Sequence, residues 1–340
     1  MSERQNRPTW MGKSVPAKYS PRDIFVFILG MHRSGTSCLT GSLEQCGLFL
    51  GEVSRSTKCN AKGTHEPIAT RRPHFRILAA NGGFWRHPPA QIIVAPRQRQ
   101  TLEKIAAQLA RNAPCGLKDP RLLLFLDTWL DVVGSLDVSP VLVGTFRHPI
   151  AVAQSLAKRN KMSEHEATTL WLLHNIQLVR LHQMYNLPII EYDLSDVQAY
   201  CRTVSDLAAA LGLEPDIDRL LEFVSASLEH NRARQSPVPT MCQEIYAYLQ
   251  QHRYQPSAYS QDGLRLQIQE GQRRTVQPMT ILQQATQTLE SERQRYARRR
   301  LWDILKWRFH LFVRSIPARS RLAKLVIVPR FIGTRENIQA

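Results

Sequence analysis

The stretch IFVFILGMHRSGTS at positions 24–37 decides the fold, because an apolar run, 24–29, meets a glycine-containing turn and then a segment typical of a helix. A turn that joins a buried strand to a helix N-terminus directs backbone N–H groups and the positive end of the helix dipole at one point. The sequence therefore predicts a phosphate-binding loop over 30–37.

This loop departs from the pattern of nucleotide triphosphatases at one position. Gly30 and Gly35 have the spacing of the Walker A motif, but Thr36 stands where that motif has lysine. The basic residue of this loop is instead Arg33, which comes before Gly35. Thr36 and Ser37 place two hydroxyls at the start of the helix. The departure argues against a nucleotide triphosphatase.

A second basic site lies more than a hundred residues further on, after the run VLVGTF at 141–146. This run predicts a strand, and Pro149 fits the first turn of a following helix. Arg147 then projects from the carboxyl end of the strand, where ligands bind in open α/β sheets. Ser155 lies about two turns into the helix, so both side chains can reach one phosphate.

The two segments resemble the sulfotransferases that use 3′-phosphoadenosine 5′-phosphosulfate. Their phosphosulfate loop has a basic residue followed by Ser-Gly-Thr-Thr/Ser, as 33–37 has here, and their 3′-phosphate is held by an arginine eight residues before a serine, as Arg147 and Ser155 are. The resemblance implies a P-loop-like α/β fold. It also implies the donor-binding residues His32, Arg33, Ser34, Gly35, Thr36, Ser37, Arg147 and Ser155.

The segment CGLKDPR at 115–121 resembles the Lys-Asp-Pro element of bacterial and tyrosylprotein-type members. The resemblance implies that Lys118 approaches the transferring sulfuryl group. Asp119, directly before Pro120, is typical of a helix N-cap, so we assign it to structure. Arg121 remains open between an anion contact and a solvated charge.

The candidate catalytic base lies in NAKGTHEP at 60–67, which resembles the Asn-x-x-Gly-x-x-Glu segment that follows the loop in many bacterial members. Transfer to an alcohol or phenol needs a base beside the acceptor and positive charge around the sulfuryl oxygens. Glu66 is the base that the resemblance implies, and His65 is the alternative. Arg33 and Lys118 would stabilise the charge, and no metal is implied, since the chain has no His-Glu-x-x-His or paired Cys-x-x-Cys spacing.

Composition and the order of the elements predict one catalytic α/β domain with an extension. With 340 residues and 43% hydrophobic content, the chain is ample for one such core, and strands alternating with helices indicate a parallel sheet covered on both faces. We expect a flexible segment over 1–22, the catalytic domain over 23–230, a linker over 231–270 and a helical basic extension over 271–340. Within the domain, the region between the first helix, 37–46, and a helix over 97–111 is expected to be irregular up to about residue 96.

Later segments complete this expected order. An apolar helix is expected from 122 to about 133, and a strand at 188–192 follows a long helix over 163–185. Helices over 197–211 and 217–228 close the domain. Six scattered cysteines, an N-terminus without a signal-like apolar stretch and the lack of a spanning segment predict a cytoplasmic bacterial enzyme.

The C-terminal segment carries much of the net charge of +17, because 291–340 holds thirteen Lys or Arg and three acids. Its stretch 301–316 places apolar side chains on one helical face. We therefore expect peripheral contact with an anionic membrane through 298–332, with packing on the protein's own core as the alternative.

Two other classes compete with the sulfotransferase. A P-loop kinase or related nucleotide-binding enzyme has a lysine after the second glycine of its loop, whereas this chain has Thr36 after Gly35. A non-catalytic membrane- or nucleic-acid-binding protein would follow from the basic charge, but no nucleic-acid module is evident, so no nucleic-acid partner is expected. The expected acceptor is a hydroxyl-bearing molecule, preferably a glycan, and the sequence predicts no oligomeric state.

Overall fold

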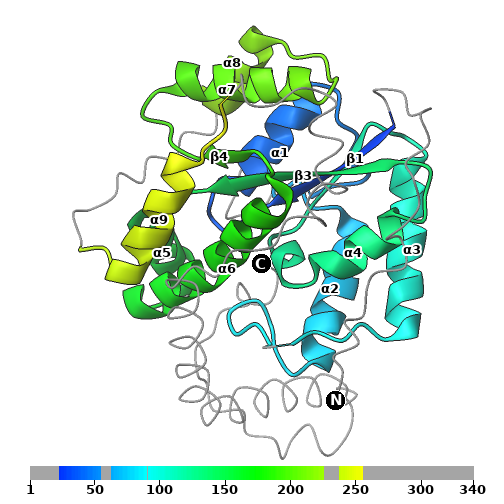
Figure 1. Ribbon diagram of the computed structural model, residues 1–340, viewed down its shortest axis with the longest axis horizontal. Coiled ribbons are helices and arrows are strands. Elements are labelled where there is room, and N and C mark those ends of the chain that lie inside the picture. The colour runs from blue at the N-terminus through cyan, green and yellow to red at the C-terminus, as the bar shows by residue number, and fades with distance from the viewer. Residues whose placement is uncertain (1–22, 55–62, 90, 226–236, 256–340) are drawn as a thin grey trace, which may run out of the picture. The chain divides into compact units, whose positions relative to one another are not determined.

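The computed structural model of the chain describes residues 23–54, 63–89, 91–225 and 237–255, and these form a parallel sheet with helices on both faces (Figure 1). The predicted α/β class, with a parallel sheet flanked by helices, is confirmed. The expectations for 1–22 and for the membrane-contacting segment 298–332 concern parts of the chain outside the described residues. Within the described segments, no helix combines the length and the apolar character needed to cross a bilayer.

The sheet has four parallel strands in the order β2-β1-β3-β4. The strands are β1 (Ile24–Leu29), β2 (Cys115–Lys118), β3 (Ser139–Phe146) and β4 (Ile189–Glu191). All six residues of β1 are buried, and β1 pairs with β2 on one side and with β3 on the other. Burial on both faces explains why β1 is a continuous apolar run and not an alternating one.

Helices cover both faces of this sheet. On one face lie α1 (Thr36–Gln45), α7 (Val197–Ala210) and α8 (Ile217–Ser225) (Figure 1). On the other side lie α2 (Ile68–Ala80), α3 (Pro96–Ala110), α4 (Leu126–Val133), α5 (Pro149–Asn160), α6 (Glu164–Tyr185) and α9 (Thr240–Gln251). Ile24, Val26 and Ile28 of β1 pack in one core cluster with residues of α1, α7 and α8. Phe27 points to the other face, where its ring lies 6.3 Å from that of Trp129 in α4.

The strand order brings the two predicted phosphate elements to one edge of the sheet. After β2 the chain crosses over β1 and adds β3 on its far side, so β1 and β3 are neighbours whose connections diverge. Ligands of open α/β sheets bind at such a switch point, beyond the carboxyl ends of the strands. The loop 30–37 follows β1 and Arg147 follows β3, so both lie at this place.

Three local expectations were wrong. The region expected to be irregular contains α2, a helix that includes Pro73 and several arginines and therefore lacks a clear helical signal. The single helix expected over 122–133 is a 3₁₀ turn, Pro120–Leu124, followed by α4, because the backbone leaves the helical conformation at Phe125, with φ of −150° and ψ of 39°. Helix α9 lies inside the stretch expected to be a linker.

Substitution of Gly35 tests how closely Tyr192 packs against the loop between β1 and α1. Gly35 caps α1 with φ of +85°, and a Cβ at this position would lie 2.2 Å from the Tyr192 ring. Gly47 also has a left-handed φ, +99°, but a Cβ there would meet nothing within 4 Å. We expect Gly47→Ala to lower the free energy of unfolding by about 1 kcal/mol, and Gly35→Ala to lower it by about 3 kcal/mol, because it adds a steric clash to the same backbone strain.

The measurement is chemical denaturation of the two variants beside wild type. Equal losses in the two variants would show that Tyr192 does not crowd the loop.

Candidate functional site

The loop between β1 and α1 is fixed to the end of β3. The Thr145 hydroxyl donates a hydrogen bond of 3.1 Å to the Ser34 carbonyl oxygen, and the Ser34 N–H donates to the Met31 carbonyl oxygen at 3.2 Å. A Cβ at Gly30 would lie 2.6 Å from the Thr145 carbonyl oxygen, so only glycine allows this approach. The turn therefore has little freedom to rearrange.

The polar groups of this loop have the character of an anion site. In the described part of the chain, no side chain caps the first turn of α1, and the buried Ser34 hydroxyl has no hydrogen-bond partner. The buried Thr64 hydroxyl also lacks one there. Buried polar groups are rarely left unpaired, so these positions fit a ligand that supplies acceptor oxygens.

Arg33 and Ser155 connect the two predicted phosphate elements directly. The Arg33 Nε donates a hydrogen bond of 2.6 Å to the Ser155 Oγ, across a separation of 122 residues. Arg33 has φ of +68°, a left-handed conformation that is unusual for a residue with a side chain. The sequence predicted that both residues bind phosphate, and the structure places their side chains in contact.

Arg147 lies in the same region as Arg33. Burial lowers the pKa of its guanidinium, and the nearby positive charge of Arg33 lowers it further, against the opposing effects of Tyr192 and Asp193; the group stays charged at neutral pH. Two like charges in a partly buried site repel each other, and an anion bound between them relieves this repulsion. The pair therefore favours a phosphate ligand.

Tyr192 is a site residue that the sequence analysis missed. Its ring faces the Arg147 guanidinium, whose Cζ lies 5.2 Å from the ring centre, and it also packs against Gly35. Burial raises the pKa of Tyr192 to about 12, so the phenol is neutral. Its position directly after β4, at the same edge as the other loops, is the signal that could have identified it.

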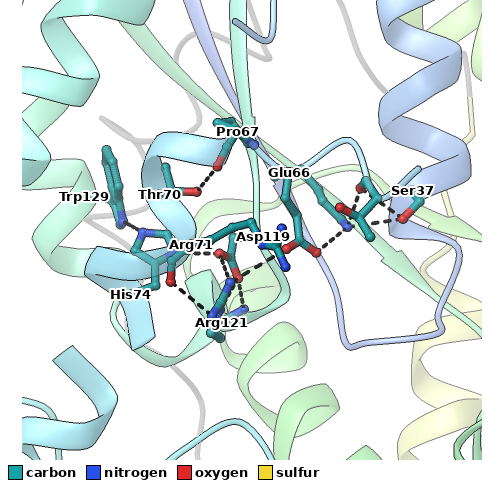
Figure 2. A network of polar contacts seen from close by, with 11 residues as sticks. Ser37, Glu66, Pro67, Thr70, Arg71, His74, Asp119, Arg121 and Trp129 are labelled. Carbon is teal, nitrogen blue, oxygen red and sulfur yellow. Dashed lines mark hydrogen bonds and ion pairs between the residues drawn. The ribbon is translucent and has the colours of Figure 1, made fainter. Parts of the chain in front are cut away.

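Lys118 ends β2 with a buried ammonium group that makes three contacts. Its side chain is 2% exposed, and its Nζ donates to the Ser37 Oγ at 3.2 Å, to the Thr64 carbonyl oxygen at 2.9 Å and to the Glu66 Oε1 at 3.1 Å. An ammonium group has three donors, so each has an acceptor. The cation thus joins the start of α1 to the candidate base Glu66 (Figure 2).

Arg121 and Asp119 continue the network on the other side of Glu66. The Arg121 guanidinium binds Asp119 through two hydrogen bonds of 2.7 Å, and one of its nitrogens lies 3.7 Å from the Glu66 Oε2. Asp119 also accepts from the Arg121 backbone N–H at 2.9 Å, so it is the expected N-cap. Arg121 is therefore not a solvated charge but one arm of a buried ion pair.

His74 and Trp129 complete the network. The Trp129 indole N–H donates to the His74 Nε2 at 3.1 Å, and the His74 Nδ1 lies 2.7 Å from the Asp119 Oδ2 (Figure 2). An indole nitrogen is only a donor, so the Nε2 accepts and the Nδ1 carries the proton that it donates to Asp119. The geometry thereby assigns a neutral His74.

Asp119 is held as an anion by these neighbours. Burial alone would raise its pKa, but the charge of Arg121 and the hydrogen bonds from Arg121 and His74 outweigh burial and hold the pKa of Asp119 well below its usual range.

His65, the alternative base, lies apart from this network. It is buried with φ of +51°, its Nδ1 contacts Glu44 of α1 at 3.0 Å, and its ring lies 5.9 Å from that of Phe223 in α8. The structure therefore brings Glu66, and not His65, to Lys118.

His32 points to a different group of residues. Its ring lies 4.7 Å from that of Trp85. Burial lowers its pKa well below the usual value, helped by the nearby charge of Arg159, so the ring is neutral at pH 7. Thr36 is buried at the start of α1.

The described residues contain no group of three or more His, Cys, Asp or Glu side chains placed to hold a metal ion. Comparison with protein-family models, with curated proteins and with solved structures gave no match for this chain. The case for function therefore depends on the geometry of the site.

Asp119→Asn tests the energetics of the network. The substitution removes the charge of the carboxylate that Arg121 contacts at 2.7 Å and leaves it only the more distant Glu66, so we expect the free energy of unfolding at pH 7 to fall by about 3 kcal/mol. Because the pKa of folded Asp119 lies below the ordinary value of about 3.9, the carboxylate stabilises the fold above that pH and loses this contribution as the pH falls below it. The difference between wild type and variant should therefore shrink on acidification.

Asp196→Asn is the matched control, because Asp196 also caps a helix, α7, but is exposed. It should cost less than about 0.5 kcal/mol, since asparagine caps as well as aspartate. Denaturant titrations from neutral pH to about pH 3, a range that spans the ordinary pKa of Asp, measure both variants. Similar losses for the two would contradict the buried network.

Proposed function

We propose that this chain is a sulfotransferase that transfers a sulfuryl group from 3′-phosphoadenosine 5′-phosphosulfate to a hydroxyl acceptor, preferably on a carbohydrate. The observation that carries the proposal is the hydrogen bond between Arg33 of the loop and Ser155 of α5, together with the electrostatic effect of Arg33 on Arg147. A donor with phosphates at both ends of its ribose needs two anion sites a few ångströms apart, and the closeness of the two segments at the switch point supports such a pair.

The residues divide between the two ends of the donor. The loop 30–37, with the uncapped start of α1, is suited to the 5′-phosphosulfate, because its N–H groups and dipole favour an anion. Arg147 and Ser155 are suited to the 3′-phosphate. Arg33 contacts Ser155 from the loop side, so we assign it a place between the two anionic ends.

Glu66 and Lys118 are assigned to the chemical step. Glu66 accepts the proton of the acceptor hydroxyl while the acceptor oxygen forms a bond to sulfur. The bond from sulfur to the bridging phosphate oxygen breaks, and adenosine 3′,5′-bisphosphate leaves with that electron pair. Lys118 stabilises the negative charge on the sulfuryl and bridging oxygens, together with Arg33. The Glu66 Oε1 is held by Lys118, so we assign the proton to Oε2, which lies 3.7 Å from Arg121.

An ATP-dependent P-loop enzyme is the second candidate, and one observation favours it. Lys118 reaches Ser37 from the neighbouring strand, so a lysine does lie at the start of α1 although none follows Gly35 in sequence. The two candidates differ in the nucleotide that they bind.

Nucleotide binding distinguishes them. We expect adenosine 3′,5′-bisphosphate at about 100 times its dissociation constant to stabilise the protein by about 2.7 kcal/mol, which raises the melting temperature by about 5–10 °C. ATP with Mg²⁺ should give a smaller shift. Arg147→Gln should abolish most of the shift, whereas Arg202→Gln, at an exposed position of α7, should not change it.

The measurement is thermal denaturation followed by fluorescence. A larger shift with ATP and Mg²⁺ would favour the P-loop enzyme, and a full shift in Arg147→Gln would remove Arg147 from the site.

Glu66→Gln tests the assignment of the base. The variant keeps the size of the side chain and an acceptor for Lys118 but cannot take a proton, so we expect the turnover number to fall by about 10²–10⁴-fold. Binding of adenosine 3′,5′-bisphosphate should persist, because Glu66 does not belong to the two anion sites. The assay measures transfer from ³⁵S-labelled donor to fractionated cell-envelope glycans.

His65→Asn is the companion variant, since His65 contacts Glu44 and not Lys118. It should retain transfer. Retained transfer in Glu66→Gln together with its loss in His65→Asn would move the base to His65.

A further inference from the structure

Trp171 of α6 contacts the backbone of Arg147, the residue that the proposed function assigns to the 3′-phosphate. Its indole N–H donates a hydrogen bond of 2.9 Å to the Arg147 carbonyl oxygen, across a separation of 24 residues. Trp171 is fully buried, so this N–H needs an acceptor inside the protein. Because Arg147 comes before His148, the N-cap of α5, its carbonyl oxygen lies outside the hydrogen-bond ladder of that helix. The indole therefore supplies a donor that the helix cannot supply.

The carbonyl groups on either side of Arg147 are also held, each by a different element. The Phe146 carbonyl oxygen accepts from the Tyr192 N–H, directly after β4, at 2.7 Å. The His148 carbonyl oxygen accepts from the Val152 N–H of α5 at 3.1 Å. Among these three donors only the indole belongs to a side chain, so it is the one that a substitution can remove.

The backbone at Arg147 limits where its guanidinium group can reach. The Tyr192 ring centre lies 5.2 Å from the Arg147 Cζ. Contact between a cation and a ring face has a broad geometry, so the backbone and the side-chain rotamer set the direction of the N–H donors. A phosphate, in contrast, needs the planar fork of the guanidinium aligned with two of its oxygens. A shift of the Arg147 peptide group would therefore weaken a 3′-phosphate contact and leave the loop 30–37 in place.

We propose that Trp171 is a positioning residue for the 3′-phosphate: through the Arg147 carbonyl group it holds the turn between β3 and α5, so that the guanidinium meets the 3′-phosphate of the donor. This inference rests on the proposed function, because it takes Arg147 as the 3′-phosphate ligand. It makes the preference for a nucleotide with a 3′-phosphate depend on a buried indole N–H.

Calorimetric titration of the full-length protein with adenosine 3′,5′-bisphosphate and with adenosine 5′-monophosphate measures this preference as the ratio of two dissociation constants. Wild type should bind the bisphosphate about 30-fold or more tightly than the monophosphate, because the 3′-phosphate pairs with a partly buried arginine. Trp171→Phe removes the N–H but keeps an aromatic ring, and it should lower the ratio about fivefold or more. Its affinity for the monophosphate should stay within about twofold of wild type, which also shows that the variant is folded.

Trp129→Phe is the matched control. Trp129 is also fully buried, and its indole N–H donates to His74 at 3.1 Å, in the network around Asp119. This variant loses the same group from the same kind of environment and should leave the ratio within about twofold of wild type. Replacement of Trp171 with benzothienylalanine, which keeps the size of the ring but has no N–H donor, should lower the ratio as Trp171→Phe does.

A double-mutant cycle tests whether Trp171 acts through Arg147. Arg147→Gln should abolish most of the preference for the bisphosphate. Addition of Trp171→Phe to Arg147→Gln should then change the ratio by less than about twofold, because two residues that act through one contact are not additive. A further fivefold loss would mean that Trp171 acts by another route, and it would overturn the inference.

The outcomes separate the inference from the proposed function. The inference is overturned, while the proposed function stands, by an unchanged ratio in both replacements of Trp171, by an equal loss of affinity for the two nucleotides, or by an equal fall of the ratio in Trp129→Phe. A wild-type protein that binds the two nucleotides equally, or an Arg147→Gln variant with the wild-type ratio, contradicts the proposed function itself.

Discussion

The hydrogen bond between Arg33 and Ser155 joins the first predicted phosphate element to the second, and the account of the site depends on it. It requires a left-handed Arg33 in a turn that is held against β3 by Thr145. It also requires β1 and β3 to be neighbours, which follows from the strand order. The Arg33–Ser155 hydrogen bond therefore depends on both the loop conformation and the strand order.

The buried charged side chains of the site make it rigid. Lys118 and Asp119 are consecutive residues at the end of β2, and each is almost fully buried, so each needs partners of opposite charge or hydrogen-bonding groups. Lys118 turns toward Glu66 and the start of α1, whereas Asp119 turns toward Arg121 and His74. One short segment thus connects the candidate base to a structural ion pair, and Glu66 is held between two cations.

The sequence allowed the central strands of the fold to be predicted, and it singled out the two segments that lie together at the switch point, because their signals are local. A continuous apolar run next to a glycine turn identifies β1 and its loop, and a strand followed by Arg147 and Pro149 identifies the second element. Helix α2 could not be predicted in this way, since Pro73 and its arginines hide the helical pattern. The partnership of His74 with Asp119 spans 45 residues and depends on packing that no local pattern reveals. Tyr192 was missed although its position directly after β4, at the carboxyl edge of the sheet, could have identified it.

A crystal structure of the protein with adenosine 3′,5′-bisphosphate tests the central claim most directly, because it locates both phosphates at once. We predict the 5′-phosphate on the N–H groups of 34–37 with Arg33 beside it, and the 3′-phosphate within hydrogen-bond distance of Arg147 and Ser155. A nucleotide bound elsewhere, or bound in the loop with the Arg147 guanidinium turned away from it, would contradict the account.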